Sequence, residues 1–145
     1  MNRKLVSLFA VAAIFSATGP ALAGSMVTGL NDSLSAHPMR YIGRCPGVIT
    51  FTGTVDVIGH FQPGSTVEIG YQFSRSDGAT GQNQFFSVAH AGPHQISETW
   101  TLGGPPVPQY AGWEKFKAWV TDSGQHPPGL GDTFSNEAHF TLTCR

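Results

Sequence analysis

Residues 49–57 read Ile-Thr-Phe-Thr-Gly-Thr-Val-Asp-Val, and they are the clearest sign of fold class in this sequence. Its apolar side chains, Ile49, Phe51, Val55 and Val57, alternate with polar side chains or glycine. A period of two residues is typical of a strand with one buried face and one wet face. The stretch therefore predicts a half-buried β-strand.

The same alternation recurs along the chain between clusters of turn residues. Strong turn signals stand at residues 62–65 (Gln-Pro-Gly-Ser) and 76–78 (Ser-Asp-Gly), where Pro and Gly supply the backbone angles that turns need. The further strands are expected at about residues 66–74, 83–90, 95–102, 113–121 and 137–144, with a weaker seventh near 39–44. This spacing predicts an all-β antiparallel sandwich of about seven strands.

Two of these strands carry more specific expectations. In residues 113–121, Phe116, Ala118 and Val120 are expected to face the core and Trp119 to be partly exposed. In residues 95–102, Glu98 falls in the apolar phase of the strand. Inward-pointing charge is one way in which proteins protect a sheet edge, so this strand is expected at an edge or near a rim.

The first 23 residues predict export. Arg3 and Lys4 precede an apolar run at residues 5–17 that is too short to span a bilayer, and a small-residue cleavage site follows at Ala21-Leu22-Ala23. Residues 1–23 are therefore interpreted as a cleaved signal peptide, and a periplasmic or extracellular destination is expected. No second apolar run long enough for a membrane span follows in the sequence.

The organisation expected for the rest is simple. Residues 24–38 show little apolar content and no period, so they predict a flexible leader. Residues 39–145 then form one β-sandwich domain. The formal charge of the chain is −1, and cleavage would remove Arg3 and Lys4 with no acidic residue. A mildly acidic product without a basic patch argues against nucleic-acid binding.

Two cysteines lie at the two ends of the segment that holds the six long predicted strands. Cys45 shares its phase with Ile49 and Phe51, and Cys144 shares its phase with Phe140 and Leu142. Both side chains are therefore expected to face the core, and an even cysteine count in an exported protein favours a disulfide. We predict a structural Cys45–Cys144 bond that closes the domain end to end.

The chain also resembles the immunoglobulin-like and fibronectin-like domains of exported bacterial proteins. The resemblance covers about residues 40–145. It rests on Cys45 beside the first long strand, Tyr71-Gln72-Phe73 before Ser76-Asp77-Gly78, Trp100 ahead of Gly103-Gly104, and residues 140–144 at the end. The cysteines stand at the ends of the domain and not on the central strand pair of antibody domains. The resemblance implies a module that binds, spaces or scaffolds.

Histidines give one hypothesis for a site. In an antiparallel sandwich, the connections after the first, third and fifth strands share one end, and these hold His60, His90, His94 and His126. Three or four imidazoles at one end could bind zinc or copper. The alternative is that these histidines are ordinary surface-loop residues that do not converge.

Aromatic side chains give a second hypothesis. The loop at residues 105–113 carries Tyr110 and Trp113. It is expected at the end of the sandwich opposite the histidines, near the turn at residues 76–82. Trp119, six positions after Trp113, is expected to be partly exposed. Exposed Trp and Tyr are typical contacts for protein partners or sugar rings. The alternative is that Tyr110 folds back over the core and Trp113 covers the mouth of the sandwich.

Motifs for catalysis are not found in the sequence. It has no Gly-x-Ser-x-Gly elbow, no His-Glu-x-x-His and no phosphate-cradling glycine loop. We therefore interpret the chain as an exported, non-enzymatic β-sandwich module with a binding or structural role and no required cofactor. The alternatives are a carbohydrate-binding or metal-binding periplasmic protein, or a subunit of an extracellular assembly whose residues 24–44 add as a strand to a neighbour.

Overall fold

The computed structural model describes residues 24–145, so the predicted signal peptide at residues 1–23 lies outside the described residues. The strands are β1 (Met26–His37), β2 (Arg40–Gly43), β3 (Gly47–His60), β4 (Val67–Arg75), β5 (Gln84–Val88), β6 (Gly92–Leu102), β7 (Gln109–Val120), β8 (Thr133–Phe134) and β9 (Ala138–Cys144), with one short 3₁₀ helix, η1 (Ser123–Gln125). Among residues 24–145 no helix is long and apolar enough to cross a membrane.

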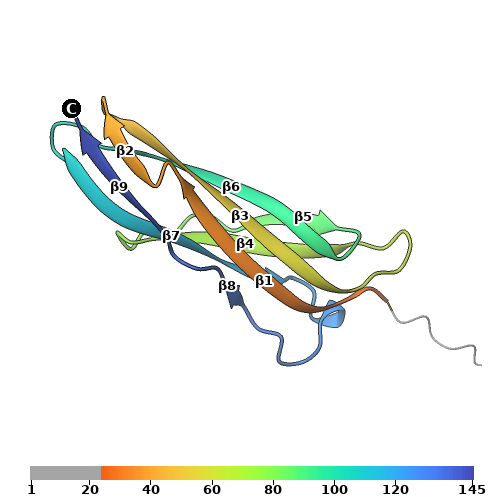
Figure 1. Ribbon diagram of the computed structural model, residues 1–145. Coiled ribbons are helices and arrows are strands. Elements are labelled where there is room, and N and C mark those ends of the chain that lie inside the picture. Colours follow the sequence, from red (N-terminus) through yellow and green to blue (C-terminus); the bar gives the residue numbers. More distant parts are fainter. Residues whose placement is uncertain (1–23) are drawn as a thin grey trace, which may run out of the picture.

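The strands form two sheets packed face to face (Figure 1). One sheet has the order β1-β3-β6. The other has the order β2-β9-β7-β4-β5, with β8 also paired to β7. The predicted all-β sandwich is confirmed, with nine strands where about seven were expected. All pairs are antiparallel except β2 with β9, which is parallel. This order is immunoglobulin-like: the first, second and fifth major strands (β1, β3, β6) share one sheet, and the third, sixth and seventh (β4, β7, β9) share the other. The fourth major strand, β5, lies on the second sheet and not on the first.

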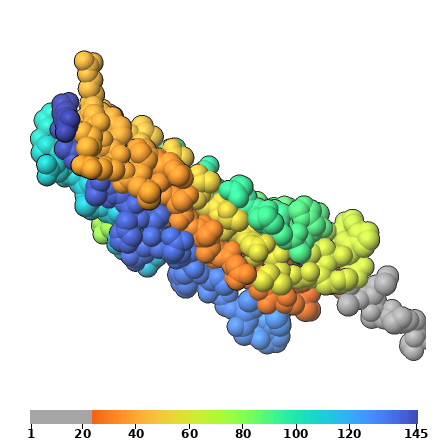
Figure 2. All heavy atoms as spheres, in the orientation of Figure 1, coloured from red at the N-terminus to blue at the C-terminus, as the bar shows by residue number. Residues whose placement is uncertain are grey.

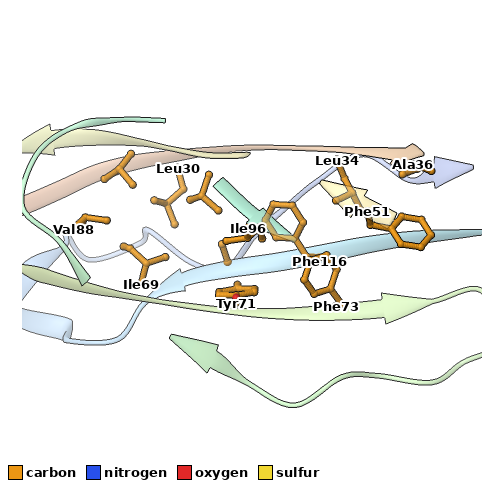
Figure 3. Close-up of a cluster of buried hydrophobic side chains, with 14 of the residues drawn as sticks. Leu30, Leu34, Ala36, Phe51, Ile69, Tyr71, Phe73, Val88, Ile96 and Phe116 are labelled. Carbon is orange, nitrogen blue, oxygen red and sulfur yellow. The ribbon is translucent and has the colours of Figure 1, made fainter. Parts of the chain in front are cut away.

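The core lies between the sheets and is mostly aromatic and β-branched (Figure 3). The inward sets predicted for β3, β4, β7 and β9 are confirmed, and all of them are buried: Ile49, Phe51, Val55, Val57; Val67, Ile69, Tyr71, Phe73; Phe116, Ala118, Val120; and Ala138, Phe140, Leu142. Phe73 and Phe116, from neighbouring strands of one sheet, have ring centroids 5.6 Å apart. Edge and tilted contacts of this kind are the preferred geometry of buried aromatic pairs.

The predicted flexible leader at residues 24–38 is wrong. Residues 26–37 form β1, which is the second-longest strand of the first sheet. It pairs antiparallel with β3, from Met26 opposite His60 to His37 opposite Thr50. Val27, Leu30, Leu34 and Ala36 are buried in the core. The sandwich therefore begins at β1 and not at residue 39, because the inward side chains of this strand are part of the core between the two sheets. Its pairing partner lies within the same chain.

The predicted disulfide is confirmed. Cys45 precedes β3 and Cys144 ends β9, so the bond joins the two sheets across 99 positions of sequence. Both cysteines are only half-buried, at one end of the sandwich, although full core positions were expected. Gly103 packs against the bond: its φ is +88°, and a Cβ there would lie 2.7 Å from the Cys45 sulfur. Only glycine satisfies both the backbone angle and the close approach.

The domain is elongated, with residue 24 and Arg145 towards opposite ends (Figures 1 and 2).

Strand β7 begins at Gln109, four residues earlier than predicted, because residues 109–114 pair with β9. The loop expected at residues 105–113 is therefore shorter than predicted, and a turn at residues 103–108 connects β6 to β7. Glu98 faces inward on β6, which is an edge strand of the first sheet, as predicted.

Candidate functional site

A groove of about 450 Å³ lies on the outer face of the second sheet. Its floor is formed by β7 and β9, and Trp113, His139, Thr141, Met39 and Ser76 contribute to its walls. Trp113 points outward because the next residue and Phe116 point into the core, and neighbouring positions of a strand face opposite sides. The groove is therefore built on two hydrogen-bonded strands and not on a long loop.

Charged side chains form the rim beside Trp113. The Lys115 ammonium lies 4.9 Å from the centre of the Trp113 ring, a cation–π contact. The Glu137 carboxylate lies between two nitrogens: its Oε1 is 3.5 Å from Lys115 Nζ, and its Oε2 is 3.5 Å from His139 Nε2. This rim has groups of both signs, so the groove offers an aromatic surface next to hydrogen-bonding and ionic contacts.

Tyr110 lies at the start of β7 and points away from the groove. Its ring stacks on Phe140 with 5.9 Å between centroids and meets Trp100 edge-on at 5.6 Å. Its hydroxyl lies 3.4 Å from the Ser76 hydroxyl. Tyr110 therefore folds back over the core, as the alternative for this residue had it. The contact between Tyr110 and Ser76 agrees with the prediction that the loop at residues 105–113 lies near the turn at residues 76–82.

Trp119 lies on the same outer face as Trp113 but is separate from the groove. It stands opposite Gly70 on β4, and a Cβ at Gly70 would lie 2.4 Å from the indole ring. The Phe85 ring meets it edge-on at 6.2 Å, and Lys117 Nζ lies 5.1 Å from its ring centre. Six residues separate the two tryptophans, about 20 Å along a strand. The structure thus brings Trp113 alone of the three predicted contact residues into the groove.

The four predicted histidines are brought together only in part. His90 and His94 stack with 5.2 Å between ring centroids, across the turn between β5 and β6. His60 lies instead beside Gln62, at 3.1 Å between side-chain nitrogens, and His126 Nδ1 lies 3.0 Å from the carbonyl of Pro127. Across residues 24–145, no three His, Cys, Asp or Glu side chains gather closely enough to hold a metal ion.

A pair of glutamates in the interior was not predicted as a site. Glu114 on β7 is 0% exposed, and neither of its carboxyl oxygens has a hydrogen-bonding partner within the described chain. Burial, which is the largest cause, and the nearby Glu98 carboxyl on β6 together raise the pKa of Glu114 from 4.5 to about 9, against the opposing effect of the Arg75 guanidinium. Glu114 therefore stays protonated near neutral pH.

Arg75 closes this interior site from one side. Its guanidinium lies 4.4 Å above the Trp100 ring and donates to both carboxyl oxygens of Asp77, at 3.3 and 3.0 Å. Arg75, Glu98 and Glu114 line a small cavity of about 140 Å³ under residues 79–81. A signal for Glu114 existed in the sequence, since it shares its phase with Phe116, Ala118 and Val120.

Comparison with known proteins adds a likeness of fold. No family model matches the chain, and no curated protein sequence matches it. Among solved structures, the chain is similar to the CARDB domain of a Pyrococcus furiosus protein, which was crystallised in complex with di-metal ions. The identity is 13%, the match covers 86% of this chain and 96% of that domain, and the TM-score is 0.46.

Proposed function

We propose that this protein is an exported, non-enzymatic binding module that contacts a protein partner through the groove beside Trp113. The observation that carries the proposal is the groove over β7 and β9, which is lined by the partly exposed indole of Trp113. Aromatic side chains held rigidly on strands contribute large contact area with little loss of conformational freedom. The ionic rim formed by Lys115, Glu137 and His139 supplies polar contacts around this centre.

The surroundings of Trp113 favour a protein over a sugar. A sugar ring stacks on an open aromatic face, but Lys115 lies over the Trp113 ring. Lys117 lies in the same way over Trp119, the other outward tryptophan. Because the Lys115 ammonium already lies over the Trp113 ring, the groove suits a partner that makes apolar contact with the edge of that ring. The same partner would place an acidic group near Lys115. Carbohydrate binding is the second candidate, since both tryptophans lie on one outer face.

Export to the periplasm or the cell exterior is part of the proposal. The Cys45–Cys144 disulfide supports it, because such bonds persist in oxidising compartments. The zinc or copper site at His60, His90, His94 and His126 stays a prediction, and the stacked pair His90 and His94 is the part of it that lies in contact.

The groove is tested by placing a photo-crosslinker at Ala111, which is exposed beside Trp113. The crosslinked material is drawn from the exported fraction of the producing cells and identified by mass spectrometry. We expect one discrete protein adduct that Trp113→Ala abolishes and Trp119→Ala retains. A glycan array run in parallel separates the two candidates, because binding of a glycan that depends on Trp113, without a protein adduct, would establish the carbohydrate function instead.

A further inference from the structure

The free edges of the two sheets differ in how they are protected. A strand edge presents unpaired backbone groups that can pair with another chain, and proteins usually block such edges. The edge of β1 is covered by Asn136, whose side chain donates to the Leu34 carbonyl and accepts from the Leu34 amide, both at 2.9 Å. The Thr133 hydroxyl adds a 2.6 Å hydrogen bond to Asp32 on the same strand.

The remaining edges, apart from β5, are also blocked. Strand β6 carries the inward Glu98 and begins at Gly92-Pro93, where proline offers no backbone donor. Strand β2 has four residues and begins with Arg40, and β8 has two residues. Charge, proline and short length are the usual devices against edge pairing.

Strand β5 lacks the charged and proline residues that protect the other edges. Its five residues, Gln-Phe-Phe-Ser-Val, include no charge and no proline, and they pair with β4 in unbroken register from Val67 opposite Val88 to Tyr71 opposite Gln84. Within residues 24–145, the backbone of β5 makes no hydrogen bond outside this ladder. Phe85 is 53% exposed on the outer face beside Trp119. An uncharged, aromatic edge strand with open backbone groups is a ready site for β-pairing.

We propose that β5 pairs antiparallel with β5 of a second copy of this chain, which joins the two larger sheets into one continuous sheet. A twofold axis places each residue of a strand opposite a residue of the same short segment. Such self-pairing is costly where like charges meet and favourable for aromatic and β-branched residues. The neutral β5 meets this condition, whereas β6, with Glu98, and β2, with Arg40, would bring like charges together.

The partner is a second copy because β5 is uncharged and aromatic, so the same segment can pair with itself across a twofold axis without like charges meeting. Phe85 from each copy lies on the outer face and extends the apolar surface of Trp119 across the junction. The contact area of one five-residue strand and this aromatic pair is small, so the dimer is a weak one that forms at high concentration. The inference does not depend on the Trp113 groove, which lies at the other end of β7.

Sedimentation equilibrium of residues 24–145 between about 10 µM and 1 mM tests the proposal, a range that brackets weak association. We expect a monomer–dimer equilibrium, and hydrogen exchange should slow at the amides of residues 84–88 as the concentration rises. Phe85→Lys should raise the dimer Kd at least about tenfold. Ser87→Lys should act in the same way if Phe85→Lys fails to fold.

Phe134→Lys is the matched control, since Phe134 is a phenylalanine of the same sheet, is 63% exposed and lies on β8. This variant should dimerise as the unaltered protein does. A monomer at 1 mM overturns the proposal, as does a dimer that both lysine variants leave unchanged or one whose exchange protection falls on β1 or β6.

Discussion

At the scale of single residues, Glu114 shows where alternation is most informative. The strand pattern correctly predicted Phe116, Ala118, Val120 and the partly exposed Trp119, yet the glutamate two positions before Phe116 drew no prediction. A carboxyl in an apolar phase is normally a sign of an edge, as it was for Glu98. Here the two glutamates face one another across the sheets, and the sequence gives no direct sign of that pairing, because it depends on how β6 lies over β7.

Glu114 makes the stability of the folded protein depend on pH. Its pKa rises from 4.5 to about 9 on folding, so between these values the native state holds a proton that the unfolded chain releases. The free energy of unfolding should then fall as pH rises, by at most about 1.4 kcal/mol per pH unit. Urea unfolding at pH 5.5 and pH 8 should show this loss.

The variant Glu114→Gln should remove most of that pH dependence, because the amide neither gains nor loses a proton in this range. It should also be more stable than the unaltered protein at pH 8. Glu137→Gln, on the surface beside Lys115, is the control and should keep the slope. An unchanged slope in Glu114→Gln would show that Glu114 is ionised in the native state.

At the scale of elements, β1 was missed for a reason that can be traced along its sequence. A register shift between Val27 and Gly29 moves the inward phase by one residue, which breaks the period of two. Beyond it, Asp32 takes an inward position between Leu30 and Leu34. Burial raises the pKa of Asp32, although the hydrogen bond from Thr133 opposes the shift. A largely polar strand with a bulge therefore has the composition of a loop.

The side chain of Asn136 holds β1 against the second sheet. Asn136→Ala removes both hydrogen bonds to the Leu34 backbone, and each such bond contributes about 1 kcal/mol net. We expect the free energy of unfolding to fall by about 1–2 kcal/mol. Amide exchange should accelerate first in residues 30–37.

Asn31→Ala serves as the comparison, because Asn31 is exposed on the same strand. It should change the free energy of unfolding by less than about 0.5 kcal/mol, the usual range for exposed sites. Equal effects of the two variants would mean that the Asn136 contacts do not hold the strand in solution.

At the scale of the whole molecule, the sequence was sufficient for the sandwich, the pairing of the cysteines and most of the core. These depend on the alternation of side chains and on chain order. The Trp113 groove could be predicted only in part, because it needs β7 to begin at Gln109 and to pair with β9. The convergence of histidines could not be judged, since loops at one end of a domain need not approach within a few Å.

The disulfide should be the largest single contribution to the stability of the domain. Closing a loop of 99 residues stabilises a protein by about 4–5 kcal/mol in the chain-entropy account. The double variant Cys45→Ser with Cys144→Ser should unfold at much lower urea concentration than the oxidised protein. Native protein should titrate with no free thiol, and two reactive thiols would contradict the closed form.

The position of the disulfide also decides how the domain would respond to mechanical tension. A load applied at residue 24 and at Arg145 acts along the long axis, because these two residues lie towards opposite ends of the body (Figure 1). The load would pass from Cys144 directly to Cys45 and would bypass every strand from β3 to β9. Only residues 24–44 could then be drawn out, by shearing β1 from β3 and β2 from β9. The domain would act as a tether of fixed maximum length.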